Sequence, residues 1–411
     1  MKRIEKQVVA YTSVCHALDH IFELTYGVVL IGIAQEFGVG LFILGVLANI
    51  AGFTFGLTAL PSGFLADRIG ERRLLMLFCL GSGVASIAVG LSPNVYVLGV
   101  ALAVLGLTLG IYHPVGSAFI TRATRQRGIA FGYLGVGGNL GVALGPILAG
   151  AIASPLGWRA PYLIFAIPAL LMAALVYSFN QAEIPTVPED TVTAGPERTR
   201  LKSIILPLAF IFLAAAMNGF IYRGLVTFLP LYLSQRLHFT FLNWDSMAIA
   251  GAFTTVALFF GVIGQLLGGY LCERRSHEGL AFIVAVVAIP LLLMMGNSEG
   301  LPLMMAAITL AFFHFMSQPI FNNLIADYAP VAWRGRSYGI SFFFAFGIGS
   351  FSATFLGYIA EQAGTNWVFT AMGGIAVIAT VLVMILLVRA RTTAREARVY
   401  QEELDRDRET L

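Results

Sequence analysis

The sequence predicts an all-α integral membrane protein in which twelve transmembrane helices form two pseudo-twofold-related six-helix bundles. Hydrophobic residues make up 58% of the 411 residues and charged residues only 11%, whereas soluble chains carry about 25% charged residues. The apolar runs are long, which favours helices over the short alternating strands of a membrane barrel. One long polar stretch divides these runs six and six.

Each apolar run reaches roughly the 20 residues that a helix needs to cross a bilayer core. In chain order, the expected spans are residues 8–32, 41–66, 73–91, 95–120, 128–153, 160–180, 203–232, 247–271, 280–296, 301–326, 337–361 and 367–388. The ninth span is short and contains Pro290.

The distribution of Lys and Arg predicts the orientation, because these residues stay on the cytoplasmic side of a membrane. With both termini cytoplasmic, every Lys and Arg lies on that side except Arg159 and Arg236, which lie outside, and Arg223, which lies within a span. Moving the assignment by one helix would destroy this asymmetry. We therefore expect a multi-pass protein of the inner (cytoplasmic) membrane.

The polar stretch also sets the expected domains. These are a six-helix bundle at 1–180, a cytoplasmic linker at 181–202, a second six-helix bundle at 203–388 and a charged cytoplasmic tail at 389–411. The halves correspond in sequence, since Pro114 near the end of the fourth span matches Pro319 near the end of the tenth. Parallel six-helix repeats of this kind place a substrate path between the two halves.

The segment GFLADRIGERRLL connects the second and third spans. It resembles the loop found there in transporters of the major facilitator superfamily, and the matching positions are Gly63, Asp67, Arg68, Gly70, Arg72 and Arg73. Gly63 is expected to let helices approach closely, and Gly70 to permit the tight turn. Asp67 is expected to cap a helix or pair with an arginine, so that the segment acts as a conformational latch.

The fifth span, GYLGVGGNLGVALGPILAG, resembles the antiporter motif of drug-efflux members of that superfamily. The matching positions are Gly132, Gly141, Gly145, Pro146 and Gly150. Small residues permit tight helix packing and proline bends the helix, and the resemblance implies exchange with limited leak. Together with HALDH in span one and YHPVGSAF in span four, this segment is similar to the fosmidomycin-resistance branch. Asp19–His20 replaces the Asn–Asp pair typical of that branch.

Span one carries four ionisable groups, His16, Asp19, His20 and Glu23, within eight residues. Their spacing of three, four and seven residues places them on one helix face. A charge at mid-bilayer costs at least about 2.5–3.5 kcal/mol, so this face cannot meet lipid. We expect it to border the transport path, with Asp19 and Glu23 carrying protons and the histidines acting as relays or substrate contacts.

Arg223 in span seven is the expected partner of this face, because aligning the two halves sets it opposite Glu23. Burial favours the protonated carboxyl, whereas a nearby guanidinium favours the ionised one. If Arg223 moves toward and away from the acidic groups during transport, their proton affinity must change. The alternative is a static ion pair that holds the halves together.

Further polar groups within the spans are candidate substrate contacts. They are His113, Asn139, Asn218, Tyr222, His314, Gln318 and Asn322. His113 and Gln318 occupy corresponding places, each directly before a proline that frees a backbone carbonyl. Phenylalanines in FFHF and SFFFAF could line an apolar pocket, although packing between helices or against lipid is their more common role.

The predicted function is that of a secondary transporter, a proton-coupled antiporter that exports a small organic molecule. We expect no cofactor, no nucleic-acid partner and a monomer in the bilayer, and no nucleophile–base set indicates an enzyme. One alternative is a proton-coupled symporter for an anionic metabolite, with Arg223 as its anchor. Another is a divalent transition-metal exporter, because His16 and His20 at i and i+4 suit a metal, with Asp19, Glu23 and His113 as further ligands.

Overall fold

The computed structural model describes residues 3–123, 126–178, 201–237, 245–330 and 334–409, and these residues form helices without any β-strand. Twelve of the described helices or helix pairs are long and apolar enough to cross a membrane. The prediction of an all-helical, twelve-span membrane protein is therefore confirmed. The expected linker lies outside the described residues except for its last two positions, which begin the helix Leu201–Arg236.

The first six spans contain seven helices: α1 (Arg3–Phe37), α2 (Leu41–Ile69), α3 (Glu71–Gly90), α4 (Val95–Leu109), α5 (Tyr112–Ala123), α6 (Arg127–Leu156) and α7 (Ala160–Ser178). The fourth span is interrupted, because α4 ends before Gly110 and α5 begins at Tyr112. The break lies beside His113, one of the expected site residues.

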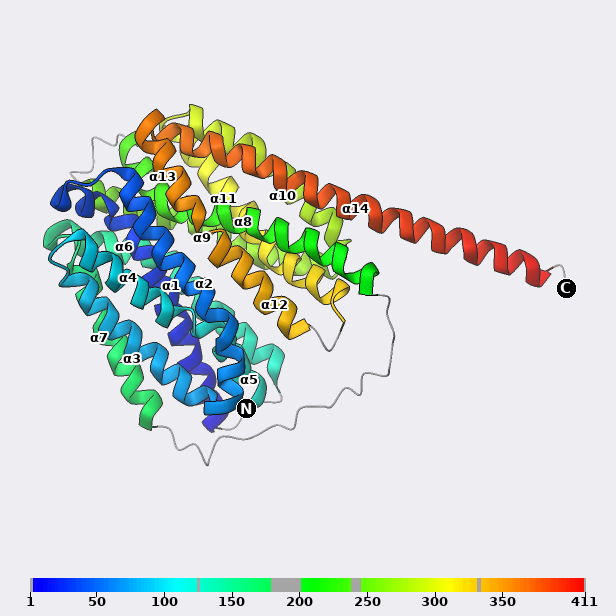
Figure 1. Cartoon of the computed structure of the whole chain (residues 1–411), viewed down its shortest axis with the longest axis horizontal. Helices are drawn as coiled ribbons and strands as arrows, with labels where there is room; N and C mark the ends of the chain where they lie inside the picture. Colours follow the sequence, from blue (N-terminus) through cyan, green and yellow to red (C-terminus); the bar gives the residue numbers. More distant parts are fainter. Residues whose placement is uncertain (1–2, 124–125, 179–200, 238–244, 331–333, 410–411) are drawn as a thin grey trace.

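The last six spans contain α8 (Leu201–Arg236), α9 (Ser246–Cys272), α10 (His277–Asn297), α11 (Gly300–Tyr328), α12 (Arg334–Phe342), the π-helix η3 (Phe343–Ile348), α13 (Phe351–Ala363) and α14 (Thr365–Glu409). The ninth span, α10, keeps its full length despite Pro290. The eleventh span changes from α to π and back to α. Figure 1 shows α14 running along the second bundle and continuing well beyond it.

The two bundles meet through symmetric pairs of spans. The second span packs on the eleventh (α2 against α13 and η3), and the fifth packs on the eighth (α6 against α9), while α1 packs on α8 near the centre. A twofold that exchanges the halves converts the second span to the eighth and the eleventh to the fifth. The observed pairs are therefore those that the predicted pseudo-twofold requires, and Figure 1 shows the two groups of helices inclined toward each other.

The interface is closed at one end of the molecule. A Cβ placed at Gly45 of α2 would lie 2.1 Å from the carbonyl oxygen of Ala353 in α13, so the two backbones touch there. The backbone N–H of Phe42 donates to Glu361 Oε2 of the opposite bundle over 2.9 Å. These contacts lie at the start of α2 and on α13, toward the end of the molecule where α1 finishes.

Candidate functional site

A cavity of about 1040 Å³ lies between the bundles on the side opposite this closed end. Its walls come from the first half of α1 and α6, the second half of α11, and the α12–η3 segment, so access is from the end that carries the N-terminus. Six of the seven expected substrate contacts line it: Asn139, Asn218, Tyr222, His314, Gln318 and Asn322. The chain is thus in a conformation that opens toward one membrane face.

The seventh expected contact, His113, stands behind the cavity wall. Its ring stacks on Phe342 and Phe346 at centroid distances of 5.8 and 6.3 Å, and those two phenylalanines line the cavity. These two phenylalanines of SFFFAF therefore face the cavity and also pack against the first bundle.

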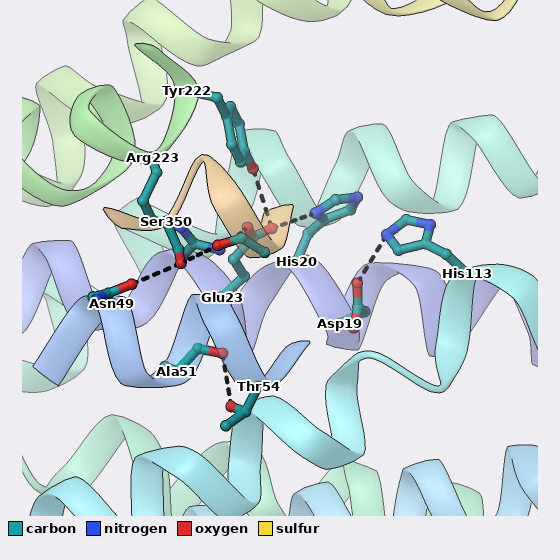
Figure 2. Close-up of polar contacts among 11 residues, drawn as sticks. Asp19, His20, Glu23, Asn49, Ala51, Thr54, His113, Tyr222, Arg223 and Ser350 are labelled. Carbon is teal, nitrogen blue, oxygen red and sulfur yellow. Dashed lines mark hydrogen bonds and ion pairs between the residues drawn. The ribbon is translucent and has the colours of Figure 1, made fainter. Parts of the chain in front are cut away.

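Glu23 lies where the bundles meet and contacts three side chains (Figure 2). Arg223 Nη2 of α8 lies 3.3 Å from Glu23 Oε1, and the Tyr222 hydroxyl donates to Oε2 over 3.1 Å. His20 Nδ1, one turn back along α1, lies 3.1 Å from Oε2. The Glu23 side chain is 3% exposed and that of Arg223 is 8% exposed. The pairing predicted from the alignment of the two halves is present.

Arg223 is held against the second and eleventh spans. A Cβ at Gly52 of α2 would lie 3.0 Å from Arg223 Nε and 2.7 Å from Ser350 Cβ, so Gly52 provides the space for both side chains. Ser350 in turn donates to Asn49 Oδ1 over 2.7 Å (Figure 2). A second, small pocket, lined in part by Glu23 and Arg223, adjoins this contact.

Asp19 faces a different neighbour from Glu23. It is fully buried, and His113 Nε2 of α5 lies 3.3 Å from its Oδ2 (Figure 2). Neither Asp19 oxygen makes a hydrogen bond of standard geometry within the described part of the chain. Asp19 lines neither of the two cavities. The contact forms where α5 packs on α1.

Three histidines gather beside these carboxylates. The ring centroids of His16 and His20 are 5.0 Å apart, and His113 lies 5.2 Å from the first and 5.6 Å from the second. One ligand nitrogen from each ring lies within 4.8 Å of the other two, an arrangement that could hold a metal ion. His16 and His20 line the large cavity.

The glycine motif of α6 packs against helices of both bundles. A Cβ at Gly141 would lie 2.4 Å from the Ala17 carbonyl oxygen of α1, and a Cβ at Gly150 would lie 2.7 Å from the Met247 carbonyl oxygen of α9. The N–H of Ile147, which follows Pro146, donates to Thr255 Oγ1 of α9 over 2.9 Å. Gly145 lies against Ile21, whereas a Cβ at Gly132 would meet no atom within 4 Å.

The expected latch segment forms the turn between α2 and α3. Gly70 adopts φ +87°, a conformation that favours glycine, which explains the tight turn. A Cβ at Gly63 would meet nothing within 4 Å, so the expected close helix approach is absent in this conformation. Arg68 is exposed. The side chain of Asp67 lies outside the described residues.

Several polar cavity residues were not among the expected contacts: Gln265, Ser317, Tyr338 and Ser341. Gln265 is an amide within the apolar run GVIGQLLGG, and this polarity alone could have identified it as a candidate substrate contact. Tyr338 and Ser341 lie in α12, directly before the π-helix.

Comparison with known proteins places these features among transporters. A family model described as "Major Facilitator Superfamily" matches residues 12–354. The cis,cis-muconate transport protein of Acinetobacter baylyi is 22% identical over 364 residues, which cover 83% of this chain and 84% of that protein.

Two further relatives share a shorter stretch. The probable sulfoacetate transporter of Cupriavidus necator is 25% identical over 259 residues, and the alignment covers 59% of each chain. The multidrug resistance protein MdtG of Escherichia coli is 27% identical over 265 residues, covering 61% of each. The match thus spans about 60% of the length of these two relatives.

Solved structures share the fold. The bacterial homolog of the human lysosomal transporter Spinster, in its inward-facing and occupied conformation, superposes with a TM-score of 0.78 at 17% identity, covering 94% of this chain and 97% of that one. The D-xylose-proton symporter superposes with a TM-score of 0.76 at 15% identity, covering 92% and 96%.

Proposed function

Because the chain belongs to the Major Facilitator Superfamily and is therefore a secondary transporter rather than an enzyme, we propose that it is a proton-coupled antiporter that exports a small organic molecule. Its two bundles alternately open the cavity to the two membrane faces. The proposal includes the predicted orientation, with both termini cytoplasmic in an inner membrane, so the cavity described above opens inward. A single chain carries both proton and substrate sites.

One observation supports the coupling of proton binding to bundle movement: the cationic partner of Glu23 comes from the opposite bundle. Arg223 Nη2 lies 3.3 Å from its carboxylate, and both side chains are almost fully buried. An ionised carboxylate that loses its buried partner is strongly destabilised. Separation of α1 from α8 therefore favours protonation of Glu23, and approach favours release of the proton. His20, 3.1 Å from Glu23 and on the cavity wall, provides the proton path.

The cavity wall supports a neutral or anionic substrate. Among the described residues that line it there is no Asp, Glu, Lys or Arg, while amides and imidazoles come from both bundles and hydroxyls from the second. Asn139 and Asn218 face it from opposite halves, and Phe342 and Phe346 add an apolar surface. An organic cation would find no carboxylate on this wall, whereas carboxylate or hydroxyl groups would find donors.

The other predicted roles fit the same scheme. The packing of Gly141 and Gly150 on α1 and α9 limits leak by keeping the fifth span in backbone contact with both bundles. The segment around Asp67 would engage only when the cytoplasmic side closes. Asp19 serves as a second proton site, linked to His113.

The direction of coupling is tested in proteoliposomes with an imposed pH gradient. Candidate substrates are first selected by thermal stabilisation of the purified protein, with cis,cis-muconate, a hexuronate, sulfoacetate and ethidium as probes. An antiporter accumulates its substrate when the lumen is acidic, because protons leaving the vesicle drive the substrate in. Glu23→Gln should lose this accumulation but retain exchange of labelled for unlabelled substrate. Gradient-driven accumulation that is unchanged in Glu23→Gln would refute the proposal.

A second candidate, proton-coupled uptake of an anionic metabolite, has its own observation. The protonatable side chains that line the cavity, His16, His20 and His314, come without a lining carboxylate. Two of the relatives are named as transporters of anions, sulfoacetate and cis,cis-muconate. A symporter accumulates its substrate only when the outside is acidic, so the same experiment with the gradient reversed separates the two functions.

A further inference from the structure

We infer that His16, His20 and His113 form a binding site for a borderline divalent transition-metal ion of the Zn²⁺ class, at the wall of the cavity. This site goes beyond the proposed transport of an organic molecule and depends on neither its substrate nor its direction. The first support is convergence: one ligand nitrogen from each of the three rings lies within 4.8 Å of the other two. No other such group occurs in the described part of the chain.

Each of the three rings has one nitrogen next to a carbonyl or carboxylate oxygen, as metal-ligating histidines do: His16 and His20 through a hydrogen bond and His113 through an ion-pair contact. Such a histidine donates one ring N–H to a carbonyl or carboxylate, which orients the ring and leaves the other nitrogen as a ligand. His16 Nδ1 lies 2.8 Å from the Leu134 carbonyl oxygen, which can only accept. His20 Nδ1 lies 3.1 Å from Glu23 Oε2, and His113 Nε2 lies 3.3 Å from Asp19 Oδ2. Each imidazole therefore keeps its second nitrogen for another partner.

Backbone geometry also holds the rings together. The i, i+4 spacing of His16 and His20 on α1 places them on one helix face. A Cβ at Gly138 of α6 would lie 2.6 Å from His16 Nδ1, so only glycine leaves room for this ring. His113 is brought to α1 by the break before α5. Donor nitrogens around one Zn²⁺, at 2.0–2.1 Å from the ion, are roughly 3.3 Å apart. Nitrogens that lie within 4.8 Å of one another therefore need to approach by at most about 1.5 Å.

Charge balance favours a divalent cation. Asp19 and Glu23 stand directly behind the rings, and both Asp19 oxygens lack a hydrogen bond of standard geometry within the described residues. Three imidazolium rings at centroid distances of 5.0–5.6 Å would repel one another, whereas three neutral imidazoles around one ion do not. The fourth tetrahedral position is left to the cavity, which His16 and His20 line.

The test is metal titration of the purified full chain, prepared with a histidine-free affinity tag and stripped with a chelator. Calorimetry with Zn²⁺ should give one ion per chain, and Mg²⁺ should not compete. His16→Gln, His20→Gln and His113→Gln should each abolish this site. Asp19→Asn should weaken it about 10–100-fold, as expected for a residue that orients a ligand. His277→Gln, at the start of α10 and away from this cavity wall, serves as the control and should keep the wild-type affinity.

A spectroscopic readout covers variants that fail to fold. Co²⁺ bound to the wild-type chain should give the intense visible absorption of a tetrahedral site, and X-ray absorption of the Zn²⁺ form should show three imidazole nitrogens. Absence of stoichiometric Zn²⁺ binding, an all-oxygen coordination shell, or unchanged affinity in the His16→Gln/His20→Gln double variant would each overturn the inference. None of these results bears on proton-driven transport, which is measured without added metal.

Discussion

Replacement of Arg223 by Gln tests whether the contact across the bundles is energetically strong. Opposite unit charges 3.3 Å apart, the separation of Arg223 Nη2 and Glu23 Oε1, attract by about 5 kcal/mol at an effective dielectric constant of about 20. Loss of one partner of a buried pair costs about 3–5 kcal/mol, because the remaining charge stays desolvated. We expect Arg223→Gln to lower the free energy of unfolding by that amount.

The assay is a double-mutant cycle with Arg223→Gln, Glu23→Gln and the double variant, each unfolded by denaturant titration in mixed micelles. If the two groups interact as a pair, the double variant should recover much of the loss, and the coupling energy should be about 3–5 kcal/mol. For a given residue 23, Tyr222 and His20 make the same contacts with it whether residue 223 is Arg or Gln. These contacts therefore cancel in the cycle, which isolates the ion pair.

Glu36 and Arg159 provide the matched control. They also form an ion pair, from α1 to the turn between α6 and α7, but their side chains are 43% and 29% exposed. Exposed pairs contribute about 0.2–1 kcal/mol. A coupling energy for Glu23–Arg223 no larger than that for Glu36–Arg159 would refute the reasoning, since it would mean that water screens the interface pair.

Three further predictions concern coupling, packing and the substrate. Asp19→Asn should impair proton-driven accumulation in proteoliposomes while Glu36→Gln on the same helix does not, and equal rates would remove the proton role of Asp19. Gly150→Val, which forces a Cβ to within 2.7 Å of the Met247 carbonyl oxygen, should destabilise the protein by about 1–3 kcal/mol and raise proton leak measured with a trapped pH dye; Gly132→Val, at a site with free space, should do neither. Asn139→Ala and Asn218→Ala should weaken ligand-induced thermal stabilisation several-fold, whereas Asn297→Ala, at the far end of α10, should leave it unchanged.

The sequence predicted the spans and the central ion pair for physical reasons. Bilayer thickness fixes the length of an apolar run, so the second and fourth expected spans, 41–66 and 95–120, coincide with those of the structure. The Glu23–Arg223 contact followed from the pseudo-twofold, because matched positions in parallel repeats face each other across the axis.

The division of labour along α1 could not be predicted from the sequence. Residues 19 and 20 differ by about 100° around a helix, so a face that contains both has two edges with different neighbours. One edge meets α5 and the other meets α8 and the cavity, but which is which depends on the break at Gly110 and on how α1 packs. The four groups were expected to form one continuous polar row on the transport path, but they lie in three different environments. His16 and His20 line the cavity, Asp19 lies beside His113, and Glu23 lies beside Arg223.

These environments favour Glu23 over Asp19 as the residue that couples protons to bundle movement. A group can shift a conformational equilibrium only by the difference in its interactions between the two states. Asp19 and its partner His113 both belong to the first bundle, so their 3.3 Å contact moves as a unit. The partner of Glu23 belongs to the second bundle. Reversing a 1:99 equilibrium requires about 5.5 kcal/mol, and loss of the Glu23–Arg223 pair supplies about 3–5 kcal/mol of it. Protonation of this one carboxyl is therefore nearly sufficient to reverse the preferred direction of opening, and substrate contacts shared by the two bundles need contribute only the remainder.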